Sequence, residues 1–292
     1  MTEKAKEQAP ANLSEIVAKA GRAGIAGGVA MAIQVTSLMW MRTTMNYQFR
    51  NGGKFVPTLK LLYSQGGISR FYRGIVPALV LGPNSRFGDT AANMFATTLF
   101  SSNPNMKSLP LFIQTGLGSF MAGCYRIFTL PLDAWKTSKQ VNGEDGLKML
   151  VQKFRKHGVS AFYQGGLASA LGTMAGHYPW FVTNNYLEHY VPKYSYKDQL
   201  GMAILRSAGI GFCCTLVSDT VSNSIRVVKT FKQTATEQLT YKEVVTEIVS
   251  KDGVTGLLFR GLPTKLMTNA IQGMVFSVAW KYLQNRMENK RQ

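Results

Sequence analysis

The chain repeats one pattern three times, and this repetition constrains its fold more than any other feature. Arg42, Lys136 and Lys229 are 94 and 93 residues apart, and a threonine follows each of them. A second mark, made of an aromatic residue, a polar residue and a glycine, recurs downstream at residues 72–74, 163–165 and 259–261. Because both marks appear in the same order three times, we expect three copies of one structural unit.

These marks divide the chain into a tail over residues 1–14 and repeats over residues 15–106, 107–196 and 197–292. Each repeat is predicted to begin with an apolar helix that ends near the basic residue and its threonine. A short amphipathic segment follows, and a second apolar helix starts near the aromatic-polar-glycine mark. The amphipathic segments are expected at residues 54–64, 144–156 and 241–251.

Charged residues are unevenly placed along the chain. Asp, Glu, Lys and Arg are absent from residues 23–41, 108–125, 158–187 and 266–280. Such lengths approach or reach those of membrane-spanning helices, and their content of Gly, Ala, Ser and Thr suits helices that pack closely in lipid. Buried helices of a large soluble α-protein are the alternative, but residues 158–187 are long for that. We therefore predict an all-α membrane protein with six transmembrane helices and three short amphipathic helices.

The formal net charge of +18 indicates an anionic neighbour, either nucleic acid or a phospholipid surface. The sequence has no zinc-ligand spacing and no RNA-binding aromatic signature, so nucleic acid is the weaker choice. Cys124, Cys213 and Cys214 lie in apolar segments without metal-ligand spacing, and no metal site is predicted. No arginine precedes Arg22, which argues against a cleaved mitochondrial presequence.

The middle repeat carries Pro131, Asp133 and Lys136, and with the three aromatic-polar-glycine marks the chain resembles the mitochondrial carrier family. The resemblance covers nearly all residues after about residue 15. It implies a six-helix bundle with threefold pseudosymmetry around a central cavity, in the mitochondrial inner membrane. An enzyme is not expected, because no nucleotide-binding loop, catalytic triad or metal cluster is present in the sequence.

The resemblance further implies a gate in which the acid of one repeat pairs with the base of the next and closes the cavity on the matrix side. Only Asp133 keeps the acid, because Met39 and Arg226 stand at the other two acid positions. Ser37 and Ser224 replace the proline, so those two helices are expected to run straighter. The predicted gate consists of Asp133, Lys136, Lys229, Arg42 and Arg226, with Lys229 as the partner of Asp133.

The substrate cavity is predicted from positions that face it in the family. Arg126 and Asp219 lie at equal depth, and they either pair with each other or serve a ligand. The predicted cavity residues are Arg86, Arg126, Asp219, His177, Lys265, Gly172, Thr173, Thr268 and Asn269, with Asp89 nearby.

The aromatic-polar-glycine marks suit a lipid phosphate, since a helix that starts at a glycine offers backbone N–H groups and the positive end of its dipole. The resemblance implies that this lipid is cardiolipin. Alternatively, the aromatic residues only anchor helix ends at the membrane interface. The predicted lipid-binding residues are Tyr72, Arg73, Gly74, Gly165, Arg260 and Gly261.

Two functions remain open from the sequence. One is transport of a small anionic metabolite, with Arg86, Arg126 and Lys265 supplying positive charge. The other is a carrier fold without transport, acting as a structural subunit of a large inner-membrane protein complex such as a respiratory complex. The degenerate gate favours the second, and the usual role of this architecture favours the first.

Overall fold

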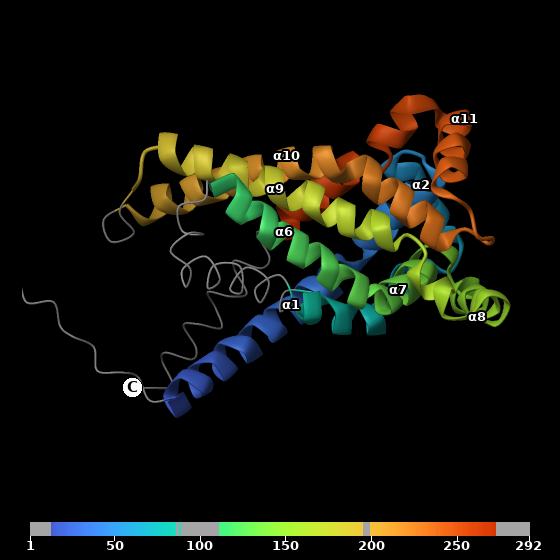
Figure 1. Ribbon diagram of the computed structural model, residues 1–292, viewed down its shortest axis with the longest axis horizontal. Coiled ribbons are helices and arrows are strands. Elements are labelled where there is room, and N and C mark those ends of the chain that lie inside the picture. The colour runs from blue at the N-terminus through green and yellow to red at the C-terminus, as the bar shows by residue number, and fades with distance from the viewer. Residues whose placement is uncertain (1–12, 86–87, 89–110, 195–198, 273–292) are drawn as a thin grey trace, which may run out of the picture.

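The computed structural model describes residues 13–85, 88, 111–194 and 199–272 (Figure 1). These residues form helices joined by short turns, and no strand occurs among them. The predicted all-helical class is therefore confirmed for the described part of the chain.

In the first repeat, α1 (Leu13–Asn51) is followed by α2 (Phe55–Ser64) and α3 (Gly67–Phe71), and another helix covers residues 75–85. The second repeat holds α6 (Leu111–Phe128), α7 (Leu130–Asn142), α8 (Asp145–His157), the 3-10 helix η1 (Gly158–Tyr163) and α9 (Gly166–Tyr190). The third repeat holds α10 (Leu200–Thr234), α11 (Tyr241–Phe259) and a helix over residues 262–272. The order of elements thus recurs in the three repeats.

The proline of the middle repeat has a visible effect on the backbone. Pro131 lies in the first turn of α7, and the helical run is interrupted at Thr129, between α6 and α7. A proline fits the first turn of a helix, because the N–H that it lacks has no partner within the helix there. The equivalent serines, Ser37 and Ser224, lie inside α1 and α10, which each continue through that point as one helix.

The three expected amphipathic segments correspond to α2, α8 and the first part of α11, and they gather at one end of the bundle (Figure 1). Thr240 caps α11 by accepting a hydrogen bond from the N–H of Glu243, whose carboxylate in turn accepts from the N–H of Thr240. Gly253, with φ of +68°, then kinks α11. A hydrophobic core cluster lies at this end, where Phe49, Phe231 and Ile248 pack together.

The helices that carry the three repeated basic residues, α1, α7 and α10, converge and contact one another pairwise. Helix α9 packs against both α6 and α10. Among the described residues, the stretch Gly201–Thr234 is long and apolar enough to cross a membrane by length and composition. Only 24% of its most apolar window is buried within the protein, which suits a lipid-facing helix. The count of six transmembrane helices stays a prediction.

Candidate functional site: a basic cavity lined by a predicted gate with one acid

A cavity of about 410 Å³ lies between the repeats. Its charged lining contains six bases and two acids, so that its formal charge is 6 − 2, or +4, over the described residues. The bases are Arg42, Arg126, Lys136, Arg226, Lys229 and Lys265, and the acids are Asp133 and Asp219. All five predicted gate residues therefore lie on this cavity, together with eight of the nine predicted cavity residues. Arg86 is the ninth, and like Asp89 it lies outside the described residues.

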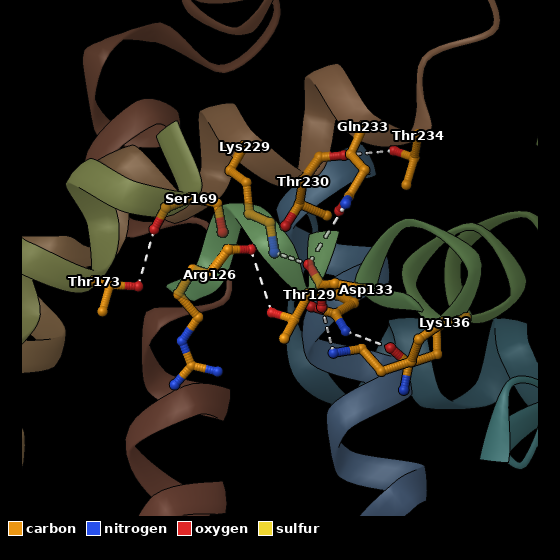
Figure 2. Close-up of polar contacts among 12 residues, drawn as sticks. Arg126, Thr129, Asp133, Lys136, Ser169, Thr173, Lys229, Thr230, Gln233 and Thr234 are labelled. Atoms are coloured by element: carbon orange, nitrogen blue, oxygen red, sulfur yellow. Dashed lines mark hydrogen bonds and ion pairs between the residues drawn. The ribbon is translucent and has the colours of Figure 1, made fainter. Parts of the chain in front are cut away.

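Asp133 is the centre of the predicted gate, where Lys136 and Lys229 surround its carboxylate (Figure 2). Lys136 Nζ lies 2.7 Å from one carboxylate oxygen, and Lys229 Nζ donates to the other. The pair between Asp133 and Lys229 joins the second repeat to the third, as expected from the carrier resemblance. Lys136, from the same turn of α7, shares the carboxylate, so one acid serves two bases.

Met39 and Arg226 stand at the other two acid positions of the predicted gate, and the nearby bases have neutral hydrogen-bond partners. Met39 is fully buried, and its sulfur accepts a hydrogen bond of 3.5 Å from Gln140 Nε2. Arg42 donates a 2.7 Å hydrogen bond to the side-chain oxygen of Gln272. Arg226 donates to the hydroxyl oxygen of Ser222 at 3.2 Å. The gate bases are therefore held partly by amides and hydroxyls.

A layer of amide side chains lies next to the gate and was missed by the sequence analysis. Asn46 donates to Gln140 Oε1 at 2.5 Å, and Gln233 Nε2 lies 3.5 Å from Asp133 Oδ2. Each of these three amides follows its repeat's basic residue by four positions. Their spacing of 94 and 93 residues equals that of the bases, so the repeat itself contained the signal.

Asp219 has a different base partner from the one considered in the sequence analysis. Its carboxylate lies 3.0 Å from Lys265 Nζ and also accepts a hydrogen bond from Asn269. Asp219 and Lys265 are both buried. Pairing within the protein is thus observed for Asp219, with Lys265 of the last repeat as the base, while Arg126 lies on the same cavity wall.

The remaining predicted positions, Gly172, Thr173, His177 and Thr268, also line the cavity. Their arrangement matches the expected placement on α9 and on the helix over residues 262–272. That they contact a solute stays a prediction.

The sequence model of the family described as "Mitochondrial carrier protein" matches residues 107–195 and 201–291, which is more than half of the chain. The chain belongs to the mitochondrial carrier family. This membership places the carrier in the mitochondrial inner membrane. A relative, the mitochondrial adenyl nucleotide antiporter SLC25A24 of Danio rerio, is 24% identical over 284 residues. The match covers 89% of this carrier but 57% of the relative, so the chain spans little more than half of that protein's length.

The glycine of each aromatic-polar-glycine mark has a left-handed backbone. Gly74, Gly165 and Gly261 have φ angles of +88°, +80° and +63°, a conformation that side chains other than hydrogen disfavour. Each glycine also approaches the next repeat closely. A Cβ at Gly74 would lie 3.0 Å from the carbonyl oxygen of Lys136, and one at Gly165 would lie 3.1 Å from that of Lys229.

The third glycine closes the ring. A Cβ at Gly261 would lie 2.8 Å from the ring of Phe49, which belongs to the first repeat. The repeats therefore contact one another in cyclic order, first to second, second to third and third to first. This is the arrangement that threefold pseudosymmetry requires.

A cation from each repeat also reaches the next repeat, where it contacts the last turn of α7, α10 or α1. Arg70 donates to the carbonyl oxygens of Gln140 and Val141 at 2.9 and 2.8 Å, and Lys153 Nζ lies 3.4 Å from the carbonyl oxygen of Gln233. Arg260 reaches the carbonyl oxygen of Arg50 at 3.4 Å. The last carbonyls of a helix lack partners within it and carry the negative end of its dipole, so a cation satisfies both needs.

We call Arg70, Lys153 and Arg260 the junction cations. They are buried, with residue exposures of 1%, 6% and 6%. Burial, followed by the neighbouring charges of Arg50 and Lys232, lowers the pKa of Lys153 to about 8. The three cations occupy unrelated positions within their repeats, and only Arg260 belongs to a repeated mark, which explains why the sequence analysis did not predict the three as a set.

The predicted lipid-binding arginines have acidic partners in the protein. Arg73 pairs with Glu144, and Arg260 lies 2.7 Å from Asp252 with 3% of its side chain exposed. Tyr72, Gly74, Gly165 and Gly261 lie at the starts of the following helices, as expected. Cardiolipin binding stays a prediction. Loss of Arg260 is expected to lower stability with or without lipid, so a stability change after its removal does not by itself indicate a lipid.

Proposed function

We propose that this carrier transports a small anionic metabolite across the mitochondrial inner membrane through the cavity between its repeats. The observation that carries the proposal is the charge of the cavity wall, +4 over the described residues. A wall that is positive and partly shielded from water attracts anions and repels cations. The relative from Danio rerio is named for adenyl nucleotides, which are anions, so an adenine nucleotide is the first solute to test.

The test is solute exchange in liposomes that contain the purified carrier and cardiolipin. Vesicles loaded with ATP, phosphate or a dicarboxylate are mixed with the labelled form of the same anion, and uptake is followed with time. We expect saturable uptake of at least one anion, and a marked decrease in Arg126→Gln, which removes one cavity charge. Arg155→Gln, on the exposed surface of α8, is the matched control and is expected to leave uptake unchanged. Absence of uptake for all three classes of anion would contradict the proposal.

A second candidate function rests on the gate. Asp133 serves both Lys136 and Lys229, while Met39 and Arg226 replace the acids that would close the other two junctions. A subunit that does not transport has no need to open and close its gate, so it can retain a gate with a single acid. In this case the chain is a structural subunit of a large inner-membrane complex, and in mild detergent it migrates with that complex instead of near its own mass of 32.2 kDa.

We further propose cardiolipin as a bound lipid at the helix starts that follow Gly74, Gly165 and Gly261. The backbone N–H groups at the start of the 25-residue helix α9 support this, because they favour an anionic head group. Mass spectrometry of lipids that copurify after delipidation and re-addition of cardiolipin or phosphatidylcholine tests the proposal. Equal retention of both lipids would contradict it.

A further inference from the structure

The wall of the cavity in the third repeat contains a pair of cations that share one buried hydroxyl. Arg226 Nε donates to Ser222 Oγ at 3.2 Å, and Lys265 Nζ lies 3.5 Å from the same oxygen. Ser222 is fully buried, whereas Arg226 and Lys265 both line the cavity. The serine therefore lies behind the two cations and holds their charged groups next to each other.

Glycines of α9 provide space for this pair. A Cβ at Gly176 would lie 3.4 Å from Arg226 Nη2 and 3.3 Å from Ser218 Oγ, so a larger side chain would press on the guanidinium. Gly172 lies one turn earlier, beside the stem of Arg226, and a Cβ added there would lie 3.7 Å from Arg226 Cγ. The guanidinium is thus accommodated between α9 and α10 at a position where the middle repeat has the gate acid Asp133.

Asp219 is the acid of the same cluster. It lies 3.0 Å from Lys265 and holds Asn269 through its other oxygen. Two bases and one acid give the cluster a formal charge of 2 − 1, or +1. Two neighbouring cations repel each other at low dielectric, and this repulsion falls when an anion bridges them.

We propose that Arg226 and Lys265, held by Ser222, form an anion subsite that binds a carboxylate or phosphate group of the transported solute. Arg226 supplies a planar pair of donors, which matches the oxygens of such groups, and Lys265 supplies a point charge. Asp219 occupies Lys265 when the subsite is empty, and the solute oxyanion exchanges with it. The inference rests on the proposed function and deepens it, because it names the chemical group recognised and the residues that recognise it.

Arg226 thereby has a role different from that of a damaged gate residue. The replacement of an acid by arginine removes one gate pair and adds a binding charge at the same level of the cavity. A solute oxyanion at Arg226 supplies there the negative charge that a gate acid supplies in the middle repeat.

The test measures binding in detergent, which does not depend on transport. The apparent melting temperature of the purified carrier is recorded with increasing inorganic phosphate or succinate, at constant ionic strength set by chloride. We expect a saturable increase for at least one of the two. Arg226→Gln and Lys265→Met are expected to raise the half-saturating concentration roughly tenfold or more, since each removes a charged hydrogen-bond donor. Arg226→Lys is expected to lie between Arg226→Gln and wild type.

Ser222→Ala tests the positioning of the two cations with a small change that the fold should tolerate, and it is expected to weaken binding severalfold. Arg155→Gln, on the exposed face of α8, is the control and should bind as wild type does. A response to phosphate but not succinate identifies a phosphate group, and the reverse response identifies a carboxylate. No response of the wild type to either anion, or an equal response in Arg226→Gln, would overturn the proposal.

The outcomes separate this proposal from the proposed function. Anion binding that requires Arg226, without exchange in liposomes, supports the subsite and contradicts transport. Exchange whose KM is the same in wild type and Arg226→Gln supports transport and overturns the subsite.

Discussion

The guanidinium of Arg70 donates a hydrogen bond of 2.9 Å to the carbonyl oxygen of Gln140, which belongs to the next repeat. Gln140 in turn accepts from Asn46 and donates to the sulfur of Met39, both in the first repeat. Gln140 therefore links Arg70, the junction cation of the first repeat, to the layer of amide side chains beside the predicted gate. Gln233 plays the same part at the next interface, since its carbonyl oxygen lies near Lys153 and its side chain near Asp133. At two of the three interfaces between repeats, hydrogen bonds of one glutamine thus join the junction cation to residues of the predicted gate.

Arg70→Met is expected to lower the stability of the carrier by roughly 2–4 kcal/mol, because it leaves the buried carbonyls of Gln140 and Val141 without a donor. The measurement is thermal unfolding in mild detergent. Arg155→Met removes an exposed cation of similar size from α8 and is expected to change stability by less than about 0.5 kcal/mol. Equal losses in the two variants would show that Arg70 acts only through its net charge.

Lys153 is expected to make stability depend on pH. Its pKa is about 8 in the folded carrier, below the ordinary lysine value of 10.5. Between these two pH values the unfolded chain binds more protons than the folded one, so stability rises as pH increases through this window. Melting temperatures from pH 7 to 10.5 check this. Lys153→Met should reduce the rise, whereas Lys156→Met, on the exposed face of α8, should retain it. If stability rises with pH by the same amount in Lys153→Met, another titrating group causes the pH dependence.

Gly74→Ala is expected to be more damaging than Gly67→Ala, although both glycines have positive φ angles, +88° and +59°. A left-handed alanine costs roughly 1–2 kcal/mol by itself. At Gly67 no atom lies within 4 Å of the added Cβ, so this cost stands alone. At Gly74 the methyl group would also meet the carbonyl oxygen of Lys136 at 3.0 Å. Thermal unfolding of both variants isolates the contact between repeats, and equal losses would show that this contact relaxes freely.

Asp133→Asn is expected to destabilise the carrier more than Lys229→Met. The first change leaves both Lys136 and Lys229 without their carboxylate, and breaking a buried pair in this way costs about 3–5 kcal/mol. The second change leaves Asp133 paired with Lys136 at 2.7 Å. The double variant should lose less than the sum of the two single losses. Thermal unfolding of the three variants provides the measurement, and additive losses would mean that the two residues are not coupled in the folded state.

The sequence by itself determined the threefold repeat and the places of α2, α8 and α11, because these features depend on backbone conformation and on spacing along the chain. The partnership of Asp133 with Lys229 was implied by the resemblance to the mitochondrial carrier family, and the structure contains it. The left-handed glycines, the proline in the first turn of α7 and the charge-free stretches act locally, so a single sequence reveals them, and the glycines recur once in each repeat.

Only the tertiary structure decided the other contacts between side chains of different helices. Asp219 pairs with Lys265, whereas the sequence left open whether Asp219 pairs with Arg126 or serves a ligand, because partner choice depends on the reach of long side chains across the cavity. The junction cations Arg70, Lys153 and Arg260 all contact carbonyl oxygens at the end of a helix in the next repeat, although they occupy unrelated positions within their own repeats. Any lysine or arginine whose side chain reaches the last carbonyls of a helix can donate hydrogen bonds to them. The fold therefore fixes where the positive charge must lie in space, but it does not fix which residue of the sequence supplies it.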